Sequence, residues 1–517
     1  MQKSLPLLRG SVTFSAALDD DDNVLQELAY PELRIQFCTY LLVHRAEIER
    51  IVSYHLGLSR KQECRIGEVK EWIAGGFNIC IPVYFNKGKA ATERVLIRFP
   101  LPYKIGESQY PGNADEKLRA EAATFIWIKD KRLPVPIPRL RGFGFASGQQ
   151  YTAIEDRPYL YQLIWRLRRF LAHIFGYHPP SPYRPVRGAH RLTTGYLLMD
   201  YVERTDGAML SETWDELRHD QNRRKNLFRG LSRIILAMAN TPFDRIGSLT
   251  IDDSAHVRLT NRPLTLRLQH LENESVPTNI NRNLTYTTTD AYLSDLLACH
   301  DNRLRTVPNS IRDRFDGQAQ LSVLTTMRAL LPHFTSRSFR HGPFVLSLTD
   351  LSQNNIFVDG DWNITCLVDL EWTCSLPGEM LNPPYWLTSR GVDQLNGEHL
   401  EPFNKLRTEF MDVFEEEEQS QSASTPHNLT EIMNDGWKTG KFWYFHALDS
   451  PKGLYNIFLN HIQPLFTKLD DKGMDEFERT LAPYWTTDVQ GFLDDKVRQK
   501  EKYDEELRQA FSQPEAV

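Results

Sequence analysis

The sequence predicts an α+β protein in which a small antiparallel sheet precedes a mainly helical region. In residues 66–99 three apolar segments, VKEWI, NICIPVYF and RVLIRF, are typical of strands, and the turns between them contain Gly75-Gly76 and Asn86-Lys87-Gly88. From about residue 205 onward, apolar residues recur mostly at helical spacing. This order predicts two lobes, a sheet lobe followed by a helical lobe, with helical extensions at the N- and C-terminal ends.

Composition narrows the class of protein. The chain has 517 residues, enough for two or three structural units with a sizeable core. The net charge of −6 gives no reason to expect a nucleic acid as partner. The six cysteines show no Cys-x-x-Cys spacing, which argues against a zinc site and a disulfide framework. No apolar run is long enough for a transmembrane segment. We expect a cytoplasmic protein, because the acidic run at 19–22 fits a mitochondrial presequence poorly.

The first half of the chain divides into three parts. Residues 1–60 form an extension that is helical over 31–57, and residues 61–202 form the sheet lobe. Within that lobe we expect a helix and two further strands, with Pro82 at an edge or bulge of the middle early strand. The helix covers 115–130, and the strands cover 141–145 and 195–202.

An insert, residues 146–192, separates these two strands and is rich in aromatic residues, arginine and proline. Its segment LIWRLRRFLAHIF, residues 163–175, is amphipathic. We expect this segment to pack as a helix on the sheet lobe. Contact with a membrane or a partner is the alternative.

The second half is predicted to be helical around a pair of hairpins. Residues 203–397 form the helical lobe, with the hairpins at 344–371, and residues 398–517 form a C-terminal helical region. The polar stretch EEEEQSQSASTPHN, residues 415–428, is predicted to be an exposed loop. The clearest helices are expected at 209–221, 222–240, 288–304 and 317–334.

The hairpin segment carries the strongest chemical signal. Asp350 precedes Asn355 by five residues, and Asp369 follows fourteen residues later, which is the spacing of a kinase catalytic loop and its metal-binding aspartate. In such a loop a carboxylate orients the attacking hydroxyl, while an amide oxygen and a second carboxylate hold Mg²⁺. We predict Asp350 as the catalytic residue, with Asn355 and Asp369 as metal ligands. Asn354 allows a register one residue earlier.

These residues make the segment resemble the aminoglycoside phosphotransferase and choline kinase superfamily, in particular its uncharacterised fungal members. The family pattern is His-Gly-Asp, four residues, Asn, and later Ile-Asp-Trp-Glu; this chain has Leu348-Thr349-Asp350, Asn355 and Val368-Asp369-Leu370-Glu371. The resemblance covers about residues 65–395 and implies a protein-kinase-like fold. It leaves the role of Glu371 open. It also departs at Leu348, because the family histidine braces the loop through hydrogen bonds and leucine cannot.

The resemblance also implies a nucleotide site in the sheet lobe. Gly75 and Gly76 occupy the position of a phosphate-covering turn, although a plain hairpin turn would have the same composition. Arg98 stands where the family has a phosphate-binding Lys or Arg, and we predict Glu121 as its partner, with Glu116 as the alternative. The hinge that binds adenine is predicted at Leu198–Val202, with Asp200 and Val202 in the nucleotide site.

The expected function is that of a Mg²⁺-dependent phosphotransferase that uses ATP or GTP to phosphorylate a hydroxyl of a small molecule. A pseudokinase that binds nucleotide without transfer is the alternative, and Leu348 and Ser352 motivate it. A protein kinase is a weaker option, because no Ala-Pro-Glu segment follows Asp369. In the helical lobe, Glu379 and Asp393 could meet a cationic substrate and Tyr385 and Trp386 could stack on it, though packing beneath a loop is the favoured explanation.

Overall fold

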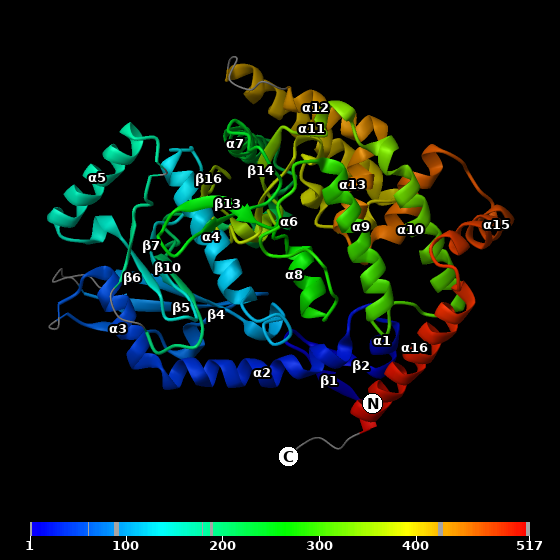
Figure 1. The fold of residues 1–517 in the computed structure, drawn as a ribbon, viewed down its shortest axis with the longest axis horizontal. Helices are drawn as coiled ribbons and strands as arrows, with labels where there is room; N and C mark the ends of the chain where they lie inside the picture. Colours follow the sequence, from blue (N-terminus) through cyan, green and yellow to red (C-terminus); the bar gives the residue numbers. More distant parts are fainter. Residues whose placement is uncertain are drawn as a thin grey trace.

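A computed structural model of the chain describes residues 3–59, 62–86, 93–177, 179–186, 190–421 and 428–512. Its mixture of helices with small antiparallel sheets confirms the α+β class (Figure 1). The expected turn at Lys87-Gly88 lies outside the described residues.

The largest sheet is antiparallel and lies in the first 200 residues. It has eight strands in the order β3-β5-β6-β10-β7-β8-β9, with β4 beside β5. The strands are β3 (Cys64–Ile66), β4 (Ile73–Ala74), β5 (Asn78–Phe85), β6 (Glu93–Pro100), β7 (Leu140–Gly144), β8 (Gln150–Ala153), β9 (Tyr183–Pro185) and β10 (Tyr196–Asp200).

Two helical layers cover this sheet. On one face lie α2 (Val24–Val43) and α3 (Arg45–Leu56), which bury Ile48 and Val52 against Ile97 and Leu198. On the other face lies α4 (Asn113–Asp130), which packs with Leu197. Side chains alternate between the faces of a strand, so this two-sided burial explains the nearly continuous apolar runs of β5 and β6.

One predicted strand is wrong. In VKEWI, residues Val69–Glu71 form a turn of 3-10 helix, and strand pairing begins only at Ile73. Local side chains stabilise the turn: the carboxylate of Glu71 accepts from the backbone N–H of Glu68, and the Trp72 indole donates to the carbonyl of Gly67. The apolar residues suit a strand, but these local hydrogen bonds favour the turn.

The 3-10 turn at Val69–Glu71 explains why β5 can hold Pro82 in its interior. The Pro82 carbonyl accepts from Gly67, so the proline nitrogen points toward the side on which β3 and β4 lie. There the chain leaves the sheet between Ile66 and Ile73, and no ladder hydrogen bond to β6 is lost.

The remaining chain is mainly helical. It holds α6 (Trp214–Leu217), α7 (Gln221–Ala239), α8 (Leu266–Asn273), α9 (Thr289–Thr306), α10 (Arg314–Phe334), α11 (Leu400–Ser420), α12 (Leu429–Thr439), α13 (Lys441–Asp449), α14 (Leu454–Ile457), α15 (Asp471–Leu481) and α16 (Val489–Ser512). Short strands are inserted between the helices: β11 (Ala208–Met209), β12 (Ser248–Ile251), β13 (Val257–Asn261), β14 (Phe344–Leu348), β15 (Ile356–Val358), β16 (Ile364–Leu367) and β17 (Thr373–Pro377).

The stretch 415–428, expected to be a loop, is helical up to Ser420. Glu417 on α11 forms ion pairs with Arg229 and Arg233 of α7, and this pairing accounts for the acidic run inside a helix. Residues 422–427 lie outside the described residues.

The ends of the described chain meet. The N-terminal strands β1 (Ser4–Pro6) and β2 (Ser11–Thr13) precede α1 (Phe14–Asp19), and this segment packs on α16 (Figure 1). Phe14 contacts Phe511 with ring centroids 5.5 Å apart, and the Tyr503 hydroxyl accepts from the N–H of Val24 at 2.9 Å. Over the described ranges, no helix is both long and apolar enough to cross a membrane.

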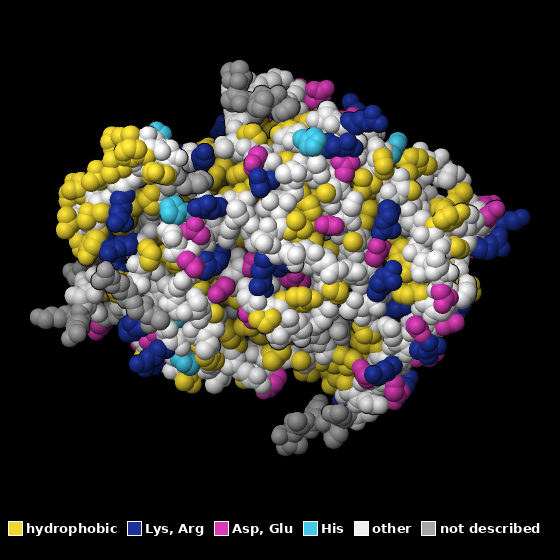
Figure 2. Space-filling model, in the orientation of Figure 1, with side chains coloured by type: hydrophobic (Ala, Val, Ile, Leu, Met, Phe, Trp, Pro, Cys, Tyr) yellow, Lys and Arg dark blue, Asp and Glu magenta, His cyan; other side chains and the backbone are white. Residues whose placement is uncertain are grey.

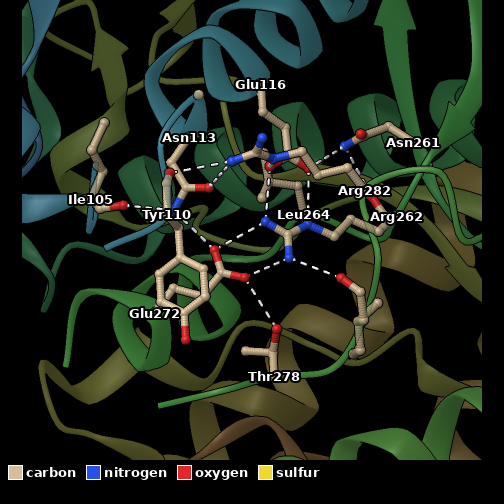
Figure 3. Close-up of polar contacts among 12 residues, drawn as sticks. Ile105, Tyr110, Asn113, Glu116, Asn261, Arg262, Leu264, Glu272, Thr278 and Arg282 are labelled. Carbon is tan, nitrogen blue, oxygen red and sulfur yellow. Dashed lines mark hydrogen bonds and ion pairs between the residues drawn. The ribbon is translucent and has the colours of Figure 1, made fainter. Parts of the chain in front are cut away.

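A buried ion network joins α4 to the segment around β13 (Figure 3). Arg262 donates to both carboxylate oxygens of Glu116, at 2.9 and 2.8 Å, and to Glu272 at 2.5 Å. All three side chains are almost fully buried, and Arg282 adds a second cation to Glu116 at 3.1 Å. Bidentate pairing of this kind compensates for the loss of hydration of the buried charges.

We predict that Arg262→Met lowers the free energy of unfolding by roughly 3–5 kcal/mol, because it leaves two buried carboxylates without their main partner. Urea denaturation would measure this change. The control is Arg258→Met on β13, the strand that ends just before Arg262; its ion pair with Asp252 is exposed and worth about 1 kcal/mol or less. Equal losses in the two variants would contradict the prediction.

Candidate functional site

The alternation of β6 directs Arg98 toward α4. Val95, Ile97 and Phe99 point to the face covered by α2 and α3, so Arg98 points to the opposite face. There it forms a buried ion pair with Glu121, which is fully buried on α4. The predicted partner of Arg98 is therefore in contact with it. The alternative, Glu116, instead binds Arg262 (Figure 3).

The segment after β16 completes this cluster. Arg98 also pairs with Asp369, and its Nη2 lies 3.1 Å from a carboxylate oxygen of Glu371. Lys117, one turn before Glu121 on α4 and fully buried, binds Glu371 at 2.8 Å. We call Arg98, Lys117, Glu121, Asp369 and Glu371 the charge cluster. It joins the sheet, α4 and the hairpin.

Asn78 extends the charge cluster to the first residue of β5. Its amide nitrogen donates to both oxygens of Glu371, at 3.1 and 3.0 Å, and its amide oxygen accepts from Lys117 at 2.6 Å. Beside it, Phe77 contacts Trp372 edge to face, with centroids 5.6 Å apart. The turn that contains Gly75 and Gly76 is thereby held against the hairpin segment.

Burial and neighbouring charges shift the pKa values of the acids in the charge cluster in different directions. Burial raises the pKa of Glu121 to about 7, although Arg98 opposes the shift. Burial also raises the pKa of Asp369, with Arg98 again opposing. For Glu371, Lys117 and Arg98 outweigh the effect of burial and hold its pKa below the usual value. Among the carboxylates of the cluster, Glu371 is thus the one most strongly held in its charged form.

The loop between β14 and β15 presents Asp350 and Asn355. The Asn355 amide nitrogen donates to the backbone carbonyl of Asp350 at 2.7 Å, which fixes the five-residue loop across its ends. The carbonyl of Asn355 accepts from the N–H of Val368 at 3.0 Å, so the loop is also joined to the segment that carries Asp369.

Thr349 braces the loop beside the position where the superfamily has histidine. Its hydroxyl donates to the carbonyl of Trp372 at 2.6 Å, so the residue before Asp350 is tied to the segment after Asp369. Leu348, which we aligned with that histidine, packs against the hydrophobic core. The absence of histidine therefore leaves a polar connection in place, supplied by the neighbouring residue.

Asp350, Asn355 and Asp369 line one small cavity of about 10 Å³, room for roughly one water molecule or ion. Two carboxylates and an amide are oxygen donors of the type that Mg²⁺ prefers, so the residues fit this ion. Asp369 also contacts Arg98, and a metal would share that carboxylate with the guanidinium. No group of three or more His, Cys, Asp or Glu side chains suited to a metal occurs in the described ranges. The remaining ligands would have to come from water or phosphate.

Asp350 and Asp369 are each held in an unfavourable environment: the site disfavours the charged form of Asp350, and Asp369 has a costly backbone conformation. Burial, together with the nearby carboxylates of Glu371 and Asp369, raises the pKa of Asp350 to about 7. Asp369 has a φ of +58°, in the left-handed region that is costly for residues other than glycine and is tolerated best by Asn and Asp. Backbone strain of this kind is concentrated at functional sites.

The predicted phosphate turn precedes β5 and the predicted hinge ends β10, and these two strands flank β6, which carries Arg98. Gly75 and Gly76 form the exposed turn between β4 and β5, and neither has a positive φ, so the turn geometry itself does not require glycine. Asp200 ends β10, and its carboxylate accepts from Arg141 at 2.6 and 3.2 Å. Val202 follows in an irregular segment. Its neighbour Tyr201 lies under the guanidinium of Arg94, at 3.9 Å.

A larger cavity of about 170 Å³ begins on the other side of the loop. Leu348, Thr349 and Leu351 line both cavities, which makes them neighbours. Tyr385 and Trp386 line the larger one, as expected of substrate-contacting residues. Glu379 and Asp393 are not among its lining residues. Glu379 instead accepts from the N–H of Ser336 at 3.0 Å, and burial raises its pKa to about 7.

Four polar residues of this region were not found by sequence reasoning. Asp449 lines the larger cavity, where burial raises its pKa to about 6, with Arg267 opposing. Lys117, Asn78 and Thr349 complete the set. Asn78 ends the segment Gly75–Asn78 in which we predict the phosphate turn, and Thr349 lies inside the catalytic motif, so both residues could have been selected by their position. Lys117 and Asp449 lie within helices and carry no such signal.

In the comparisons with known proteins, no protein-family model and no curated protein matches this chain.

We predict that Asp350→Asn stabilises the protein at pH 8 by about 1–3 kcal/mol and has little effect near pH 4. The pKa of Asp350 is raised in the folded state, so folding retains its proton between about pH 4 and pH 7. The resulting stability is therefore lost as the pH rises through this range, and asparagine removes the dependence.

Urea denaturation at pH 4, 6 and 8 would measure the difference between wild type and variant. The control is Asp361→Asn, an exposed residue of the same hairpin region, for which the difference should not vary with pH. A constant or inverted difference for Asp350→Asn would show that the carboxyl is not held protonated by its surroundings.

Proposed function

We propose that this protein is a Mg²⁺-dependent phosphotransferase with a bilobal, protein-kinase-like fold, and that it transfers the γ-phosphate of ATP or GTP to a hydroxyl of a small molecule. The observation that carries the proposal is a convergence. Arg98, Glu121 and Asp369 come from three separate segments and meet in one charge cluster, while Asp369 also shares a cavity with Asp350 and Asn355. In the sequence, the motif spacing indicated Asp350, Asn355 and Asp369, and the family resemblance indicated Arg98 and Glu121.

The charges of the site support a cation-dependent reaction. The charge cluster and Asp350 together hold four carboxylates, those of Glu121, Asp350, Asp369 and Glu371, against the two cations Arg98 and Lys117. A divalent cation would offset the excess negative charge and lower the raised pKa values of the acids nearest to it.

Each residue has a distinct part in the proposed reaction. Asp350, with a pKa of about 7, would orient the acceptor hydroxyl and take its proton. Asp369 and Asn355 would hold Mg²⁺, which supplies charge neutralisation at the phosphates. Arg98 would exchange its contact with Asp369 for a nucleotide phosphate, while Glu121 keeps the guanidinium in place. Thr349 would hold the loop in the position that the family histidine normally secures.

The cavity of about 170 Å³ supports a small acceptor with an apolar part. Its lining is mostly aliphatic and aromatic, and its polar side chains include those of Thr349, Asn382, His446 and Asp449. A hydroxyl presented from this cavity would face Asp350 across Leu348 and Leu351, which line both cavities.

A pseudokinase is the second candidate, and one observation favours it. Arg98 contacts three carboxylates at once, those of Glu121, Asp369 and Glu371. A guanidinium that is engaged by three carboxylates would have to give up at least one of them to bind a phosphate. The protein could then bind nucleotide weakly or without transfer.

Thermal unfolding with and without Mg-ATP or Mg-GTP tests the nucleotide site. We expect the wild type to be stabilised, by about 2.7 kcal/mol at 100 times Kd, and Asp369→Asn to lose most of this gain. The comparison is the ligand-induced shift within each variant, because loss of the Arg98 contact changes the baseline stability. Asp361→Asn, which leaves the site intact, should keep the full shift. An unchanged wild type at saturating nucleotide would refute both candidates.

Turnover separates the two candidates. We predict that the wild type hydrolyses Mg-ATP slowly and that Asp350→Ala reduces the rate by about 100-fold or more while the nucleotide-induced shift persists. Release of labelled phosphate would measure the rate. Binding without hydrolysis or transfer in the wild type would favour the pseudokinase.

A further inference from the structure

The insert helix α5 (Tyr159–Ile174) turns its apolar face outward, contrary to the expectation that this face would pack on the sheet lobe. Six of its large apolar side chains are 43–63% exposed: Leu160, Leu163, Ile164, Leu167, Phe170 and Ile174. None of its residues is buried. Figure 2 shows these hydrophobic side chains gathered over the position that α5 occupies at the left of Figure 1.

The opposite side of α5 holds it to the protein. The Trp165 indole donates to the carbonyl of Ser181 at 2.7 Å, and Arg169 pairs with Asp130 of α4 at 3.0 Å. Gln162 donates to the carbonyl of Arg157 at 2.9 Å. These residues recur at helical spacing on one side, so the orientation of the helix is fixed by polar contacts and the apolar side is left unpartnered.

Arginines border the apolar face on both sides. At about 100° per residue, the apolar side chains from Phe170 to Ile164 span an arc of roughly 120°, and Arg166 and Arg168 lie about 40° beyond its two edges. Both arginines are exposed. Cations in these positions can reach outward past an apolar surface while their stems lie along it.

The whole segment around α5 lacks acidic residues. From Arg157 to Met199 the sequence contains seven arginines and no Asp or Glu, within a chain whose net charge is −6. Acids close to the helix are already paired: Glu155 with Lys129, Asp156 with Arg139, and Asp130 with Arg169 of the helix itself. This surface is therefore complementary to a negatively charged one.

We propose that α5 attaches the protein to the surface of an anionic lipid bilayer, lying in the plane of the interface with its apolar face inserted. An apolar arc with aromatic residues and with arginine at its borders is typical of such interfacial helices. A second copy of the chain is a poor occupant, because two such faces would bring the arginine borders together with no carboxylate from the segment to pair them.

Vesicle flotation of the full-length protein tests the attachment. We expect wild type to float with phosphatidylcholine vesicles that contain about 30% phosphatidylserine, and much less with phosphatidylcholine alone. Leu167→Asp with Phe170→Asp should reduce partitioning by at least about 100-fold. The matched control is Phe315→Asp with Tyr484→Asp, two apolar residues that are 79% and 78% exposed elsewhere. It should float like wild type.

The charge contribution is tested separately. Arg166→Gln with Arg168→Gln should reduce partitioning to the anionic vesicles by about 10- to 30-fold. Raised salt should likewise reduce the partitioning of the wild-type protein. Arg498→Gln with Arg508→Gln on α16 changes the net charge equally on exposed residues of a distant helix and should have little effect.

Three results would overturn the proposal. One is equal partitioning of wild type to both vesicle types. Another is an equal loss in the control variants. The third is a dimer in lipid-free sedimentation that Leu167→Asp with Phe170→Asp dissociates, which would assign the face to a second copy. None of these results depends on nucleotide binding or turnover.

Discussion

The structure depends on the pairing of charged side chains that α4 buries. This helix is covered along most of its length, yet it carries Glu116, Lys117 and Glu121 in its buried part. An unpaired charge in such a place costs several kcal/mol, so each of these residues needs a partner from another segment. Glu116 pairs with Arg262, which directly follows β13. Lys117 pairs with Glu371 of the hairpin region, and Glu121 pairs with Arg98 of β6.

This requirement fixes the geometry of the candidate site. The hairpin region is joined to the sheet and to α4 through Asp369, Glu371 and their cations. The small cavity, which is lined by residues between 348 and 373, therefore lies beside this junction. Burial, together with the nearby carboxylates of Glu371 and Asp369, raises the pKa of Asp350, which favours proton transfer and lowers stability at neutral pH. A site that is unfavourable to the fold and suited to chemistry is a common compromise in enzymes.

Sequence periodicity was sufficient for the parts of the fold in which one pattern dominates. The strands β5 and β6 and the helix α4 lie where their apolar residues predict, and alternation along β6 implies that Arg98 leaves the face used by Ile97. It failed at Val69–Glu71, where local hydrogen bonds override strand propensity. It could not reveal Lys117 either, because a lysine in a helix is expected on the surface. Its burial is explained by distant partners, chiefly Glu371, 254 residues away, and also Asn78.

The same limit applies to α5. Periodicity correctly indicated an amphipathic helix, but amphipathicity does not determine which side faces the protein. The decisive contacts are made by Trp165 and Arg169 with Ser181 and Asp130, residues whose positions depend on the rest of the fold.

Charges are buried in the cluster around Arg98, and apolar side chains are exposed on α5. Both depart from the usual distribution, in which charges lie outside and large apolar groups inside. For the buried charges the compensation lies within the protein, since Arg98 and Lys117 have carboxylate partners. For α5 no described residue covers the apolar face, and we propose that a lipid surface supplies the compensation.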